Sequence, residues 1–120
     1  MVRQGKMKSP PYFDKMHSGS RCVVLESGID FDSFPSAAER WAKKLDLRIL
    51  KRADGPDERV WDCERKGKKF WLAYDHWFPT ISLEPQDAEA GAEIKSIGDA
   101  LGAKEEEPNQ SLQPTPPRGG

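Results

Sequence analysis

The sequence is poor in the residue types that hold metal ions or cross-link small folds. Its 120 residues include two cysteines and two histidines. Cys22 and Cys63 lack CxxC spacing, and two thiols in a chain of this length do not make a disulfide framework. We therefore expect both cysteines to be buried, reduced thiols, and we expect neither a metal ion nor a cofactor.

Long hydrophobic runs are absent as well. No apolar stretch approaches the roughly 18 residues that a membrane-spanning helix needs. The basic residues near the N-terminus are not followed by the apolar segment of a secretory signal. These absences predict a soluble, cytoplasmic protein.

Motifs for catalysis are also scarce. The sequence has no GxSxG motif and no glycine-rich loop that would bind phosphate at the start of a helix. Asp75 and His76 are the only adjacent acid and imidazole, but neighbours in a strand point to opposite faces. We expect His76 to be a surface residue, which favours a function without catalysis. A small enzyme or metal-assisted site around His76 and Asp75 is the alternative.

The net charge of -1 combines segments of opposite sign. Residues 1–20 carry four Lys and Arg residues against one acid, whereas residues 21–103 carry thirteen against sixteen. A negatively charged central segment is a poor match for a phosphate backbone. The basic run at residues 65–69 is typical of edge lysines that discourage strand aggregation. Nucleic acid is therefore an unlikely partner.

Residues 59–75, with the sequence RVWDCERKGKKFWLAYD, predict a β-hairpin. Lys66-Gly67 lies between two alternating segments, and glycine at the second loop position permits the positive φ of a tight primed turn. A two-residue loop fixes the register and places Trp71 opposite Asp62. One face of the hairpin then carries Trp61, Cys63, Phe70, Leu72 and Tyr74, and the other carries Val60, Asp62, Glu64, Lys69, Trp71, Ala73 and Asp75.

Further strands are expected at residues 21–26, 47–52 and 80–84, where β-branched or alternating residues occur. A first helix is expected to begin after the capping residues Asp32-Ser33, with Pro35 in its first turn, and a second to end at Gly102. Each helix has one apolar stripe. The stripes consist of Phe34, Ala37, Ala38, Trp41 and Leu45 in the first helix and Ala90, Ile94, Ile97 and Leu101 in the second.

The element order β-α-β-β-β-β-α predicts a single α+β domain, with a mostly antiparallel sheet and both helices packed on one face. The helix between the first two strands permits a right-handed crossover, which would place these strands parallel and adjacent. We assign the domain to residues 21–103. Residues 1–20 and the Pro-rich residues 104–120 are expected to be a flexible N-terminal arm and a disordered C-terminal tail.

Two parts of the sequence resemble known proteins. Residues 21–101 resemble a group of small uncharacterised bacterial α+β proteins, through Asp-x-Phe-Pro at 32–35, the Trp-rich hairpin and TISLE at 80–84. This group implies no catalytic residues. Residues 109–120, NQSLQPTPPRGG, are similar to the endings of proteins encoded on mobile integron gene cassettes. The second resemblance implies an accessory, transferable role, such as an immunity or antitoxin-like partner, a regulator or a small binding protein.

If both helices cover the face of Trp61, then Trp71 stands on the open face of the sheet among charged residues. An exposed apolar patch ringed by charge usually marks an interaction site. We predict a non-enzymatic module that binds a protein or a small apolar ligand through this face. Two alternatives stay open, namely cover of Trp71 by neighbouring side chains or a tail, and a homodimer interface. The predicted binding residues are Val60, Lys69, Trp71, His76, Trp77 and Phe78.

Overall fold

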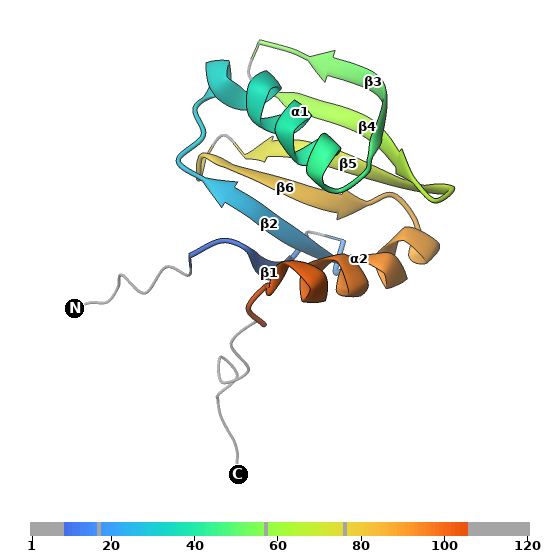
Figure 1. The fold of residues 1–120 in the computed structure, drawn as a ribbon. Coiled ribbons are helices and arrows are strands. Elements are labelled where there is room, and N and C mark those ends of the chain that lie inside the picture. The colour runs from blue at the N-terminus through green and yellow to red at the C-terminus, as the bar shows by residue number, and fades with distance from the viewer. Residues whose placement is uncertain (1–8, 17, 57, 76, 106–120) are drawn as a thin grey trace, which may run out of the picture.

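The computed structural model describes residues 9–16, 18–56, 58–75 and 77–105 (Figure 1). These residues form one sheet with two α-helices. The strands lie in the order β1-β2-β6-β5-β4-β3, each antiparallel to its neighbours. The expected α+β fold is confirmed. Its elements are β1 (Tyr12–Lys15), β2 (Arg21–Ser27), the 3-10 helix η1 (Phe31–Ser33), α1 (Phe34–Lys44), β3 (Arg48–Asp54), β4 (Arg59–Arg65), β5 (Lys68–Asp75), β6 (Thr80–Pro85) and α2 (Ala88–Leu101).

The hairpin of β4 and β5 has the predicted register, with Asp62 opposite Trp71. Lys66 and Gly67 in its turn have φ angles of 53° and 78°, as a primed two-residue turn requires. The apolar face of the hairpin is turned toward the helices. Its residues Trp61, Cys63, Phe70 and Leu72 are almost fully buried, and Tyr74 is half-buried.

The start of α1 differs from the expectation in its capping hydrogen bond. The Ser33 side chain makes no capping hydrogen bond. Instead, the Asp30 carboxylate accepts from the Ser33 backbone N–H at 2.8 Å and begins the 3-10 turn that leads into α1. Ser33 is the N-cap residue of α1, as the sequence predicts, but the side-chain hydrogen bond that caps this segment comes from Asp30, three residues upstream. Pro35 lies in the first turn of α1, as expected.

The second helix is capped at both ends, and it ends at the glycine that the sequence indicates. The Asp87 carboxylate accepts from the Ala90 backbone N–H at 2.8 Å, and Gly102 ends the helix with a φ of 73°. Both helices lie on the same side of the sheet, where their apolar stripes meet its buried face (Figure 1). The Phe34 ring, for example, packs edge-to-face on Trp61, with ring centroids 5.4 Å apart.

The crossover through α1 is longer than expected. The strands on either side of α1 are β2 and β3, which we expected to be adjacent. They point the same way in the sheet, but β6, β5 and β4 lie between them. The reason is that the three hairpin connections from β3 to β6 fold the chain back until β6 reaches β2, whose edge would otherwise be unpaired.

The sheet also contains a strand that the sequence analysis missed. β1 lies within residues 1–20, which we assigned to a flexible arm. Phe13 gives this segment no repeating apolar pattern, yet its side chain is 1% exposed and packs against α2 at Gly98. A residue without a side chain is needed there, because a Cβ on Gly98 would overlap the Phe13 ring. Pairing with β2 and the packing of Phe13 against α2 therefore hold β1 in the fold.

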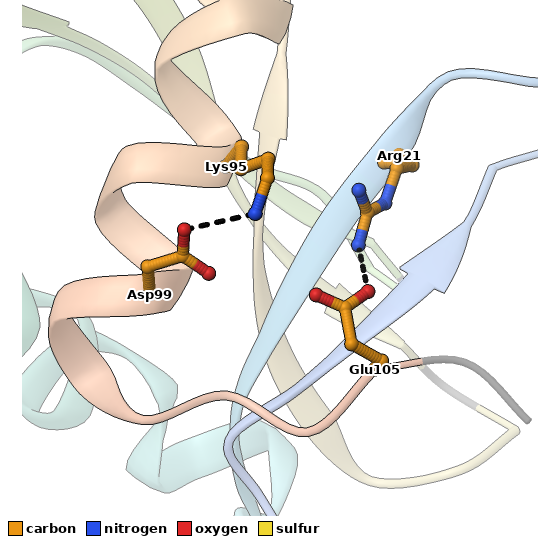
Figure 2. A network of polar contacts seen from close by, with 4 residues as sticks. All are labelled: Arg21, Lys95, Asp99 and Glu105. Atoms are coloured by element: carbon orange, nitrogen blue, oxygen red, sulfur yellow. Dashed lines mark hydrogen bonds and ion pairs between the residues drawn. The ribbon is translucent and has the colours of Figure 1, made fainter.

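Residues directly after α2 complete this edge of the sheet. The Phe13 backbone N–H donates to the Lys104 carbonyl at 2.8 Å. Arg21 pairs with Glu105 at 2.7 Å (Figure 2). Figure 2 also shows the pair of Lys95 and Asp99 on α2. Residues 104 and 105, which we assigned to the tail, thus contact the sheet. The rest of the tail and His17 lie outside the described residues.

Candidate interaction surface

The face of the sheet away from both helices carries a row of small side chains. The strand registers place Val24, Ser82, Ala73 and Val60 side by side across β2, β6, β5 and β4, with Tyr12 of β1 at one end. Val24, Ser82 and Ala73 are only 5%, 7% and 9% exposed, although neither helix lies on this face (Figure 1). Opposed Cβ atoms in a sheet lie about 5 Å apart. At this spacing, larger side chains on the same face can reach over small ones and shield them from water. The row forms the floor of this open face.

Trp71 lies on the open face, as the hairpin predicts. It stands between Glu84 of β6 and Asp62 of β4 in the register of the sheet. Its side chain is half-buried, and so is that of Val60, whereas Lys69 is exposed. The half-burial of Trp71 agrees in part with the alternative that neighbouring side chains cover it.

The turn between β5 and β6 presents two aromatic side chains to solvent. Trp77 is 83% exposed and Phe78 is 61% exposed, the highest values of any large hydrophobic residue in the described chain. Their backbone N–H groups donate to the Asp75 carboxylate oxygen Oδ1 at 2.9 and 3.3 Å. Asp75 thereby fixes the turn, and the two rings project from it. His76, the remaining predicted residue of this turn, lies outside the described residues.

The open face carries more acids than bases: Asp14, Asp62, Glu64, Asp75 and Glu84 lie on it together with Arg48, Lys51 and Lys69. Burial raises the pKa of Glu84, and the nearby charge of Asp75 also raises it. A hydrogen bond with Ser82 has the opposite effect and lowers this pKa, but the net shift is upward. Burial also raises the pKa of Tyr12, with further contributions from Asp14 and other neighbours. Since Asp75 acts on both groups, these side chains share one electrostatic environment. Asp62 adds a carboxylate opposite Trp71, and Gln86 Nε2 donates to this carboxylate at 3.4 Å.

The thiols give no nucleophile. Cys63 is buried in the core, and burial followed by the charge of Asp62 raises its pKa to about 12. A thiol with this pKa stays protonated at neutral pH and is inert. Cys22 is also buried, and both cysteines are free of disulfide bonds. No group of three or more metal-ligating side chains occurs among residues 9–16, 18–56, 58–75 and 77–105.

Part of this surface was missed because it comes from separate strands. Tyr12 lies in the segment taken for a flexible arm, and Glu84 was read only as the end of an alternating strand. The only signal for this strand is the adjacent aromatic pair Tyr12 and Phe13, which is too short to predict a strand alone. Only the pairing of β1, β2 and β6 with the hairpin brings these residues to one face.

These observations define the class of the protein: a small α+β fold in which two helices cover one face of an antiparallel sheet and leave an acidic, aromatic face open. Within it, the chain belongs to the family described as "Protein of unknown function (DUF3630)", whose family model matches residues 12–97. The match begins at β1, which agrees with the place of this strand in the sheet. No curated protein and no solved structure matches the chain. Among the described residues, neither helix is long and apolar enough to cross a membrane.

Proposed function

We propose that the protein is a non-enzymatic binding module and that it binds another protein through the open face. The contact surface consists of the face around Trp71 together with the turn that carries Trp77 and Phe78. The partner is a protein with a basic and apolar surface. This role fits the accessory, immunity or antitoxin-like function that the resemblance of residues 109–120 to cassette-encoded proteins implies, because such proteins act by binding other proteins.

The exposure of Trp77 and Phe78 is the observation that carries this proposal. Large aromatic side chains dominate the binding energy of many protein interfaces. Here two of them are adjacent, and the two N–H bonds to Asp75 hold their backbone in place. Backbone positions that are already held by hydrogen bonds lose little conformational entropy on binding.

The charge of the open face favours a partner that differs from this chain. In a homodimer built face to face, both copies would bring the same excess of carboxylates, among them Asp62, Asp75 and Glu84, into one interface. Like charges that meet in an interface oppose association. A basic partner would instead supply cations to these carboxylates. The acids therefore favour a hetero-partner over self-association.

The enzyme alternative gains less support. The Asp75 carboxylate already accepts two backbone N–H groups, which gives it a structural task in the turn. Both bonds go to Oδ1, so a catalytic role for Asp75 would have to use Oδ2. Asp75 can be exchanged for asparagine, which also caps such turns.

The test is affinity capture on the immobilised protein from lysate of the source cells. It compares wild type with the variant Trp77→Ser/Phe78→Ser and with the control Leu50→Ser. Leu50 is 43% exposed on the edge strand β3, away from the proposed surface. We expect a protein that wild type and Leu50→Ser retain, and whose affinity falls at least about tenfold in the double variant. Free wild-type protein should compete with the capture, and added salt should weaken it.

A set of retained proteins that does not change in the double variant contradicts the proposal. Light scattering on the same samples separates the homodimer alternative. A wild-type dimer that becomes a folded monomer in Trp71→Ser would assign the open face to self-association.

A further inference from the structure

A second candidate site lies on the helix side of the sheet. A cavity of about 440 Å³ opens between the end of α1, the turn of the β4–β5 hairpin and the second half of α2. Ligand pockets in proteins usually measure about 300–1,000 Å³. The cavity is lined by Lys44, Leu45, Asp46, Arg65, Lys66, Glu93, Ser96, Ile97, Ala100 and Leu101.

The inner wall of this cavity is apolar and fixed. Leu45 and Ile97 belong to the buried core, and Leu101 packs against the core from the end of α2. Their positions are set by the packing of both helices on the sheet. The wall can therefore receive an apolar body without rearrangement of the fold.

A guanidinium group stands at the side of the cavity. Arg65 Nε donates to the Leu45 carbonyl at 2.9 Å, and Arg65 Nη1 pairs with Glu93 at 2.7 Å. Both charged side chains are about one-fifth exposed, so water screens them only partly. A guanidinium carries five N–H donors, and these two contacts use two of them. Arg65 is thus oriented and keeps donors for a further acceptor.

The lining of the cavity carries a small excess of positive charge. Its charged residues are the cations Lys44, Arg65 and Lys66 and the acids Asp46 and Glu93, a net charge of +1. Lys44 and Lys66 line the cavity, and neither forms an ion pair with a described residue. Lys44 instead lies 5.0 Å from the centre of the Trp41 ring. Two ammonium groups are therefore available at the opening of an apolar cavity.

We propose that this cavity binds a small amphipathic anion. Its apolar body contacts Leu45, Ile97 and Leu101, and its anionic head, a carboxylate or a phosphate, contacts Lys44 and Lys66. The size of the cavity and its apolar wall favour a small molecule over a nucleic-acid strand, which would need a longer basic groove. The site is on the other side of the sheet from the proposed protein-binding face and does not depend on it.

The probe for this site is 1-anilinonaphthalene-8-sulfonate, an apolar dye with one anionic group. Its fluorescence is titrated with the full-length protein, and octanoate, octyl phosphate and octanol are then added as competitors. We expect both anions to displace the dye at concentrations at least about tenfold lower than octanol does, because charge-assisted hydrogen bonds contribute at this order. The ratio of octanoate to octyl phosphate identifies the preferred head group.

Two pairs of variants locate the binding. Ala100→Trp fills the cavity, and its control is Ala92→Trp, at an exposed alanine of α2 that does not line it. Lys44→Gln/Lys66→Gln removes the two free charges. Its control, Lys15→Gln/Lys51→Gln, removes two charges elsewhere. We expect each cavity variant to weaken dye binding at least about tenfold against its control, with unchanged circular dichroism.

Equal displacement by octanol and octanoate overturns the proposal, and so does equal dye binding by the lysine variant and its control. If Ala100→Trp does not fold, the lysine pair still decides. Dye binding that falls in Trp71→Ser but not in the cavity variants would place the dye on the open face, and this also overturns the proposal. Loss of the cavity site leaves the affinity-capture result of the proposed function unaffected.

Discussion

Neighbouring residues of one strand differ in burial according to the face of the sheet on which they lie. On β5, Phe70 and Leu72 are fully buried under the helices, whereas Trp71 between them is half-buried on the open face. Across the sheet, the helix side packs large rings such as Phe34 and Trp61 against each other. The open side is floored by small side chains such as Ala73. Large side chains thus contribute to stability on one face and are available for contact on the other.

Substitution of Phe70 and Trp71 gives the largest contrast between the faces. Phe70→Ala should lower the free energy of unfolding by about 3–5 kcal/mol, because it leaves a cavity in the core. Trp71→Ala should cost less than half of that, because its side chain is half-buried and neither helix packs over it. Urea unfolding, followed by circular dichroism, measures both values. Equal losses would show that Trp71 belongs to a second core and would remove it from the proposed surface.

A smaller effect is expected where β1 meets α2 on the helix side. Gly98→Ala places a methyl group in the space of the Phe13 ring, and overpacking of this kind typically costs about 1–3 kcal/mol. Alanine in a helix interior would otherwise stabilise by about 1 kcal/mol relative to glycine. Thermal unfolding gives the net sign, which we expect to be destabilising.

Gly91→Ala is the matched control for Gly98→Ala, because Gly91 lies in the same helix and a methyl group added there would enter open space. We expect this variant to gain stability. A gain at both positions would mean that β1 moves away at little cost, and β1 would then be a weakly held edge.

The smallest effect is expected on the open face and depends on pH. Burial raises the pKa of Glu84 above its ordinary value in the folded protein, so ionisation of this group opposes folding. The stability linked to its protonated form is full below the pKa of the unfolded state and is lost as the pH rises through the folded-state pKa. Glu84→Gln should therefore raise the melting temperature at pH 8 and change it little at pH 3.

The exposed residue Glu58, in the loop between β3 and β4, provides the control Glu58→Gln. An equal gain at both pH values would show that Glu84→Gln acts through packing and not through charge. The ionisation of Glu84 also links stability to binding, since a cation from a partner would lower the pKa of Glu84.

The hairpin could be predicted because its information is local. Lys66-Gly67 sets the turn, and the alternation on either side of it sets the two faces, which the register confirms. The position of β1 could not be predicted, because the burial of Phe13 depends on Gly98, which is far away in the sequence. The prediction that β2 and β3 are adjacent was wrong for a similar reason, since periodicity identifies strands but not their neighbours in the sheet.

The candidate surface was predictable to the same extent. The hairpin places Trp71 on the open face, and its sequence alone shows this. The burial of Ala73 and the pKa of Glu84 depend on β2 and β6, whose pairing the sequence does not state. The exposure of Trp77 follows from the Asp75 cap, which composition does not reveal.

The contact between β1 and residue 104 has a consequence for synthesis of the protein. Phe13 emerges from the ribosome early, but the helix that buries it and the Lys104 carbonyl that accepts its backbone N–H follow about 90 residues later. At a translation rate of about 5–20 residues per second, several seconds pass in which Phe13 has no burial site. The meander from β3 to β6 can form its hairpins during this interval. β1 can pair with β2 as soon as residues 21–27 emerge, but Phe13 stays exposed until α2 forms, and a chaperone that binds exposed aromatic residues would find it accessible until then.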